Sequence, residues 1–267
     1  MNQFDGEFMC GSYFKSLCKY SVQEYTDARN HKFCFKIHRE GDPTKVFCKT
    51  EYLNHFLHNF SIEYPFDLLT HNSDVNIEDG NYANAKILQP NLRYWHAQNL
   101  NVNHEMMRVL PIGLANPKWK HGNQQDFEKV VGDRCDKNNS LDVCFDLYTN
   151  PPERQRCLDA IKVPMRERLP FYDHLKQLKS SFFCISPDGN GIDCHRHWEA
   201  LYLKTIPIVT RSIFTEKLKE IGLPIVVIED WADFQNLELS SDFYLETWKD
   251  FDLKVFQENL RKTLTSE

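Results

Sequence analysis

The residue types best suited to anion binding lie in a loop-like segment, residues 186–199, which reads S-P-D-G-N-G-I-D-C-H-R-H-W-E. The proline and the two glycines disfavour a regular helix or strand at the start of this segment. Short apolar runs at 182–185 and 207–210 are typical of buried strands. Trp198, Leu201 and Tyr202 follow with helical spacing. The sequence therefore predicts a strand, a glycine-containing loop, a helix and a second strand.

Such a unit can hold a nucleotide diphosphate. The first turn of the helix presents unpaired backbone N–H groups and the positive end of the helix dipole. Arg196 adds a guanidinium that can bind a phosphate through two N–H groups, and Glu199 can accept hydrogen bonds from a ribose. Spacing alone also fits an ordinary strand–helix turn with Arg196 and Glu199 as a surface ion pair. Asp193 is the expected cap of this helix.

Two further polar groups are expected at the carboxyl ends of strands, where open α/β sheets bind ligands. His71 and Asp74 follow the apolar run 65–70, and either side chain can accept a proton as a general base. A turn-forming role for Asp74 and a structural role for His71 are the alternatives. A strand is expected at 141–148 and a helix at 154–161. Arg154, at the start of this helix, is a second candidate for phosphate binding, with a solvated helix residue as its alternative.

Composition limits the classes of function. The net charge of −6 disfavours a general nucleic-acid-binding protein. The nine cysteines show no CxxC pair, and His195 and His197 point in different directions on a helix, so we expect no metal site. The polar N-terminus lacks the features of a secretory signal, and no apolar run is long enough for a membrane span. We therefore expect a cytoplasmic protein with reduced thiols.

The remaining elements follow an alternating α/β pattern. Strands are expected at 32–39, 46–48, 86–89, 93–98, 108–114 and 224–228. Helices are expected at 50–60, 79–85, 171–178, 215–221 and 229–234, with further packed helices in the tail at 243–264. The polar stretch 116–140 is the expected connection between two halves. This pattern predicts two Rossmann-like domains with parallel sheets that face a cleft.

The segment 186–201 resembles the exostosin-like glycosyltransferase family, as do T-I-P-I-V at 205–209 and I-E-D-W-A-D-F at 228–234. The stretches L-T-H-N-S-D at 69–74 and L-P-I-G-L-A-N at 110–116 are similar to segments of small members encoded by large algal viruses. Together these motifs span roughly residues 45–235. The chain is short for the family, and it shows no membrane anchor or stem of the kind that animal Golgi members carry.

The resemblance implies the GT-B fold: an N-terminal acceptor domain at 1–118, a C-terminal nucleotide-sugar domain at 119–240, and C-terminal helices at 241–267 that can pack back on the first domain. It implies an inverting transfer from a UDP-sugar without a prosthetic group or bound metal. Within the motifs we assign Asp74, His71 and Arg196 to catalysis. Donor binding is assigned to Arg154, Ser186, Gly189, Asn190, Gly191, Asp193, His195, Arg196 and Glu199.

The expected activity is transfer of a sugar, with xylose as the best choice, to a hydroxyl of a glycan acceptor. The alternatives are a non-catalytic module of the same fold that binds nucleotide sugars or glycans, and a GT-B transferase that uses GDP-fucose. A viral origin would place the protein in the host-cell cytoplasm.

Overall fold

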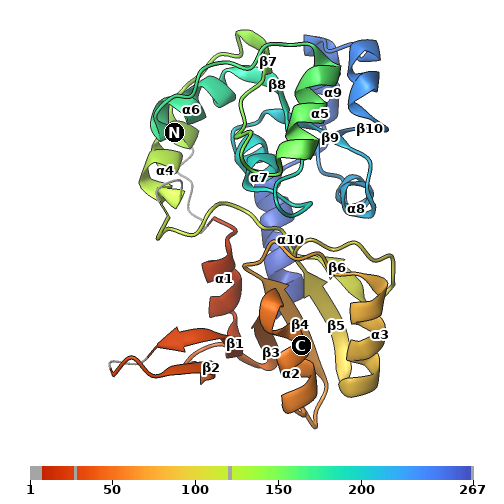
Figure 1. The fold of residues 1–267 in the computed structure, drawn as a ribbon. Coiled ribbons are helices and arrows are strands. Elements are labelled where there is room, and N and C mark those ends of the chain that lie inside the picture. Colours follow the sequence, from red (N-terminus) through yellow and green to blue (C-terminus); the bar gives the residue numbers. More distant parts are fainter. Residues whose placement is uncertain (1–7, 27–28, 120–121, 266–267) are drawn as a thin grey trace. The chain divides into compact units, whose positions relative to one another are not determined.

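The computed structural model describes residues 8–26, 29–119 and 122–265, and these form two compact units (Figure 1). The N-terminal unit contains Met9–Ile112 and the end of the last helix from Leu260 onward. The C-terminal unit contains Gly113–Asn259 together with Phe8. The stretch 1–7, in which we expect no secretory signal, lies outside the described residues.

The N-terminal unit is built on a six-stranded sheet with the order β2-β1-β3-β4-β5-β6. All neighbouring strands are parallel except the antiparallel pair β1–β2 at one edge. Parallel strands joined by helices are typical of Rossmann-like folds. The strands are β1 (Cys18–Thr26), β2 (Lys32–Ile37), β3 (Asp42–Lys49), β4 (Phe66–His71), β5 (Leu92–Ala97) and β6 (Met107–Val109).

Helices precede and connect the strands of this unit, and their apolar faces build its core. They are α1 (Gly11–Ser16), the 3-10 helix η1 (Thr50–Tyr52), α2 (Leu53–Asn59) and α3 (Asp79–Leu88). Phe56 of α2 and Ala85 of α3 belong to one apolar core with Trp95. The indole N–H of Trp95 donates to Thr70 Oγ1 at 2.9 Å, which satisfies the polar atom that this burial would otherwise leave unpaired.

The C-terminal unit has a four-stranded parallel sheet with the order β10-β9-β8-β7. Its core contains Phe183 and Ile185 of β8, Cys157 of α5 and Trp231 of η3. The elements are α4 (Gln124–Gly132), β7 (Asn139–Asp142), α5 (Pro151–Ile161), α6 (Phe171–Lys179), β8 (Ser181–Ile185), α7 (His195–Tyr202), β9 (Ile206–Thr210), α8 (Ile213–Glu220), β10 (Val226–Ile228), η3 (Trp231–Asn236), α9 (Ser241–Trp248) and α10 (Leu253–Thr265). The residues of α10 from Leu260 onward belong to the N-terminal unit.

The structure confirms a mixed α/β protein whose sheets are mainly parallel, and it corrects several local predictions. The strand expected at 108–114 ends at Val109, and the strand expected at 141–148 ends at Asp142. Residues 86–89 are not a strand: they complete α3, because Gln89 N–H donates to Ala85 O at 2.8 Å. The polar connection 116–140 contains a helix, α4, whose first turn is capped by Asn123. The N-cap of α7 is Cys194 rather than Asp193.

No helix among residues 8–26, 29–119 and 122–265 combines the length and the apolar character that a membrane crossing requires. The same described residues contain no group of three or more histidine, cysteine, aspartate or glutamate side chains placed to hold a metal ion.

Two glycines of the N-terminal unit should respond oppositely to alanine. Gly41 has φ +110°, and an added Cβ would lie 2.5 Å from the backbone carbon of Cys18. Gly80 lies in α3, and an added Cβ would meet no atom within 4 Å. We expect Gly41→Ala to lower the free energy of unfolding by about 2–4 kcal/mol. Gly80→Ala should raise it by about 0.5–1 kcal/mol.

Denaturant unfolding of the two variants tests this expectation. Equal effects of the two substitutions would contradict the assigned backbone conformation at Gly41.

Candidate functional site

The first strand–helix connection of the C-terminal unit brings Asn150 and Arg154 to the glycine loop. Asn150 has a left-handed backbone conformation, and Pro151 and Pro152 follow at the start of α5. Proline suits these positions because the first N–H groups of a helix have no partner within the helix. The Asn150 side chain donates from Nδ2 to Gly189 O at 2.8 Å, so it joins this connection to the loop after β8.

Arg154, in the first turn of α5, also joins the connection after β7 to the connection after β8. Its Nε donates to Asp188 O at 3.0 Å, and its Nη1 donates to Asp146 O at 2.6 Å. The side chain is buried, and no carboxylate of the described residues lies within ion-pair distance. Its Nη2 makes no hydrogen bond with the described residues and lies beside Gly189, where a Cβ would be 3.6 Å away. A buried cation with an unused donor is suited to an anionic ligand.

Asp188 places a carboxyl group in the same loop. Its backbone O is bound by Arg154, whereas its carboxylate has no hydrogen-bond partner among the described residues. Burial raises the pKa of this carboxyl from 3.8 to about 6, with Glu153 adding to the rise and His197, Arg154 and Arg156 opposing it. A protonated carboxyl can donate to a ligand oxygen, whereas the ionised form would repel a phosphate.

The side chains that follow the loop anchor α7. The buried Ser186 hydroxyl lies 2.7 Å from His197 Nδ1, and Cys194 Sγ lies 3.4 Å from the same nitrogen. Asp193 Oδ1 accepts the indole N–H of Trp198 at 2.8 Å. Cys194 supplies no side-chain cap to α7. Ser186 and Asp193 therefore serve the internal packing of this connection. Within the first turn of α7, the His197 N–H donates to Cys194 O at 3.1 Å.

Arg196 is turned toward the interior of the unit. Its Nη1 is 3.7 Å from Asp142 Oδ2 and is buried without a hydrogen-bond partner among the described residues. Asp142 is also bound by Arg166, whose Nε is 2.5 Å from Oδ1. The expected alternative to phosphate binding, an ion pair of Arg196 with Glu199, is wrong, because the carboxylate within ion-pair distance of Arg196 is that of Asp142.

Glu199 lines a small pocket of the C-terminal unit. The other lining residues are Leu114, Gly122, Asn123, Gln124, Phe127 and Phe171. Burial raises the pKa of Glu199, and the charge of Arg196 opposes this rise. Its carboxyl group has no hydrogen-bond partner among the described residues.

The other residues that the sequence assigned to binding of the donor substrate lie around the same loop. Gly189 N–H donates to Gly191 O at 3.1 Å, so the loop closes on itself. Asn190, between them, is exposed. His195 Nδ1 lies 2.8 Å from Gly113 O, which requires the proton to be on Nδ1. The structure thus brings Arg154, Asp188 and the glycine loop together, with Arg196 turned into the interior.

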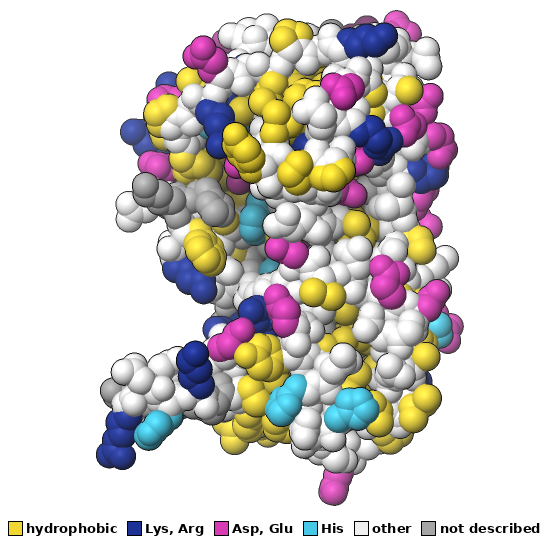
Figure 2. All heavy atoms as spheres, in the orientation of Figure 1, with side chains coloured by type: hydrophobic (Ala, Val, Ile, Leu, Met, Phe, Trp, Pro, Cys, Tyr) yellow, Lys and Arg dark blue, Asp and Glu magenta, His cyan; other side chains and the backbone are white. Residues whose placement is uncertain are grey.

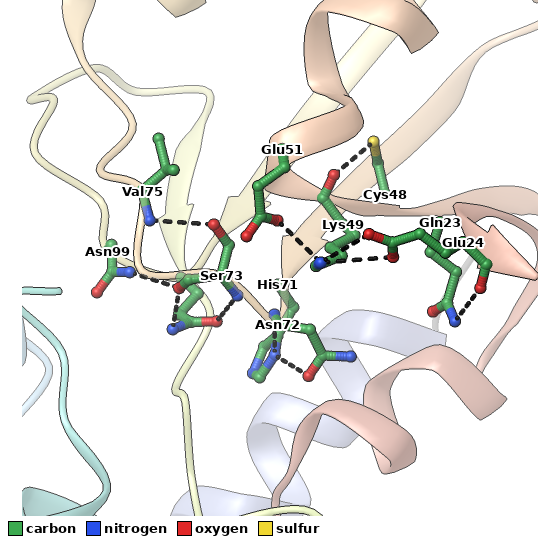
Figure 3. A network of polar contacts seen from close by, with 11 residues as sticks. Gln23, Glu24, Cys48, Lys49, Glu51, His71, Asn72, Ser73, Val75 and Asn99 are labelled. Atoms are coloured by element: carbon green, nitrogen blue, oxygen red, sulfur yellow. Dashed lines mark hydrogen bonds and ion pairs between the residues drawn. The ribbon is translucent and has the colours of Figure 1, made fainter. Parts of the chain in front are cut away.

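The carboxyl ends of β1, β3 and β4 carry the polar groups of the N-terminal unit (Figure 3). Lys49 Nζ is 3.1 Å from Glu24 Oε1 and 3.7 Å from Glu51 Oε2. His71 is buried: its Nδ1 accepts from Asn72 N–H at 2.7 Å, and its Nε2 lies 2.9 Å from Pro111 O. Both ring nitrogens are therefore engaged, which favours a structural role for His71.

Asp74 follows this strand end in a turn. Ser73 Oγ accepts from Val75 N–H at 3.0 Å, and Ser73 O accepts from the side-chain amides of Gln98 and Asn99. These bonds fix the backbone on both sides of Asp74, whose side chain is exposed. Of the two predicted bases, Asp74 is the one that solvent and a ligand can reach.

Sequence reasoning did not select Asn150 and Asp188. The N-P-P sequence at 150–152 predicts the helix start, but the left-handed backbone that turns the Asn150 side chain toward Gly189 has no sequence signal. Asp188 lies within the predicted loop, and a proline–aspartate pair before glycine reads equally as a turn. The burial of its carboxyl group distinguishes Asp188 from an ordinary turn residue, and the sequence does not reveal that burial.

No protein-family model matches this chain, and no curated protein sequence matches it significantly.

The carboxyl group of Asp188 predicts a pH dependence of stability. Because its folded-state pKa of about 6 exceeds the ordinary 3.8, folding favours the protonated form, and stability falls as pH rises from about 4 to above 6. Asp188→Asn removes this cost. We expect the free energy of unfolding of Asp188→Asn to be about 1–2 kcal/mol higher than that of the wild type at pH 8, after allowance for partial solvent screening. At pH 4 the difference should be much smaller.

Denaturant unfolding at both pH values measures the difference. Asp136→Asn is the matched control, because Asp136 is exposed in the same unit. A pH-independent effect of Asp188→Asn would show that this carboxyl ionises normally.

Proposed function

We propose that this protein is an inverting glycosyltransferase that moves a sugar from a UDP-sugar to a hydroxyl of a glycan acceptor. The proposal combines the motif resemblance with the chemistry of the glycine loop. The resemblance favours xylose as the sugar and a reaction that uses no bound metal. It also implies the GT-B arrangement, in which the C-terminal unit binds the donor and the N-terminal unit binds the acceptor.

The observation that carries the proposal is the buried Arg154 guanidinium beside Gly189. Arg154 Nη2 makes no hydrogen bond with the described residues. Helix α7 starts at His195, directly after the same loop, so its first turn lies next to this loop. Loss of UDP places negative charge on the departing diphosphate. A fixed cation and backbone N–H groups stabilise that charge without reorganising in the transition state. Arg154 is therefore our first choice for this role, ahead of Arg196.

Two other residues have roles in the proposed reaction. Glu199, whose carboxyl group has no hydrogen-bond partner among the described residues, is the proposed partner of the ribose hydroxyls. Asp74 is the proposed general base, because its exposed carboxylate can take the proton of the acceptor hydroxyl.

The face drawn in Figure 2 favours a nucleotide-sized anion over a polymer of phosphates. On the face drawn in Figure 2, Lys and Arg side chains are interspersed with Asp and Glu rather than gathered in one basic patch. Extended nucleic acid requires many phosphate contacts. A diphosphate requires one local cation and a few N–H groups.

Calorimetric titration with UDP tests the donor site. We expect Arg154→Met to weaken UDP binding about ten- to hundredfold, because a charge-assisted hydrogen bond contributes about 1.5–3 kcal/mol. The matched control is Arg156→Met on the same helix, since Arg156 pairs with Glu153 and Asp230 at the surface. Arg196→Met tests the competing assignment.

Unchanged affinity in Arg154→Met, with a normal melting temperature, would remove this residue from the phosphate site. Arg154→Lys keeps the charge and should show an intermediate loss. GDP and its sugars, titrated in parallel, distinguish a GDP-fucose enzyme from a UDP-sugar enzyme.

Turnover tests the general base. We expect Asp74→Asn to reduce sugar transfer by at least about a hundredfold while UDP affinity stays unchanged, because general-base catalysis contributes about 10²–10⁴ in rate. The assay measures UDP release from a panel of UDP-sugars with glycan acceptors. Exposed Asp79, in the same unit, supplies the control variant Asp79→Asn. Nucleotide binding without turnover in the wild type would favour a non-catalytic binding module.

A further inference from the structure

A second cluster of reactive groups lies in the N-terminal unit, on the edge strand β2 and on α2. Cys34 Sγ is 3.1 Å from His55 Nε2. On the other side of the ring, Asn59 Nδ2 is 3.3 Å from His55 Nδ1. Cys34 is half-buried, and His55 and Asn59 are exposed. A nucleophile within hydrogen-bond reach of an imidazole, which a third group orients, is the general pattern of an activated nucleophile.

The orientation of the Asn59 amide fixes the proton on the imidazole ring. Asn59 Nδ2 also donates to His55 O at 2.9 Å, and a backbone carbonyl can only accept. The same NH₂ group therefore donates to His55 Nδ1, which leaves the single proton of the neutral ring on Nε2. That N–H points at the sulfur of Cys34. A donor aimed at the sulfur stabilises the thiolate, which is the form that attacks disulfides.

We propose that Cys34 is a modification site that forms mixed disulfides with low-molecular-weight disulfides. The thiol of Cys34 first loses its proton to water. The thiolate sulfur then attacks one sulfur of the disulfide, the S–S bond breaks, and the other sulfur leaves as a thiolate. The attacked disulfide is the oxidant, so the exchange needs no other co-reactant. This site is independent of the proposed glycosyl transfer, whose residues are elsewhere in the chain.

The other cysteines provide an internal comparison. Cys135 is exposed, and its Sγ contacts the backbone O of Asp136 at 3.6 Å, without a histidine partner among the described residues. Cys194 is half-buried. The remaining six are buried, namely Cys10, Cys18, Cys48, Cys144, Cys157 and Cys184. If exposure alone decided reactivity, Cys135 would react first.

The experiment follows the reaction of the full chain with oxidised glutathione at pH 7, with each modified cysteine identified by peptide mass spectrometry. We expect Cys34 to react about tenfold faster than Cys135, because an unassisted thiol is only a few per cent thiolate at this pH. His55→Gln should remove this advantage, and Asn59→Ala should reduce it.

Melting curves establish that each variant is folded. We expect the variants to fold because His55 and Asn59 are exposed. The matched control is His58→Gln, because His58 is an exposed histidine on the same helix, and this variant should leave the rate at Cys34 unchanged. A Cys34 rate no greater than that of Cys135, or a Cys34 rate that His55→Gln leaves unchanged, would overturn the proposal.

Discussion

The two hydrogen bonds of Arg154 hold together the part of the C-terminal unit that the proposed function depends on. One side chain binds Asp146 O after β7 and Asp188 O after β8, so the two neighbouring connections keep a fixed separation. Both acceptors are neutral carbonyls, and the positive charge is therefore not cancelled by a carboxylate of the described residues. The loop gains rigidity from the cation while the cation stays available to an anion, which is the preorganisation that electrostatic catalysis requires.

A second polar network explains why Arg196 is less suited to that role. Asp142 accepts from Arg166, and Arg166 Nη2 lies 2.7 Å from His174 Nδ1. Arg196 adjoins this network through Asp142. Burial and the nearby arginines lower the pKa of His174 to about 3, so this histidine is neutral and adds no further positive charge. The network fixes α6 and the start of α7 against the end of β7, and removing the Asp142 carboxylate would leave the half-buried guanidinium groups of Arg166 and Arg196 without this charge partner.

The sequence predicted those features that depend on local patterns. Apolar runs located β4, β8 and β9, and the proline pair located the start of α5. Ile87 and Leu88 misled the prediction of 86–89, because a two-residue apolar run fits a strand or the end of a helix equally well. The contacts that Arg154 and Asn150 make with the glycine loop join residues more than thirty positions apart, and no periodicity encodes them. No periodicity encodes the contact of Arg196 with Asp142 either, because Asp142 ends β7 whereas Arg196 lies in α7, after the loop that follows β8.

The proposed function requires the glycine loop and Arg154 to bind the diphosphate of a UDP-sugar. A crystal structure with UDP bound tests it most directly. We predict diphosphate oxygens within hydrogen-bond distance of Arg154 Nη2 and of the first-turn amides of α7, with the ribose at Glu199. A diphosphate bound elsewhere in the chain, with Arg154 touching only Asp146 O and Asp188 O, would contradict this assignment.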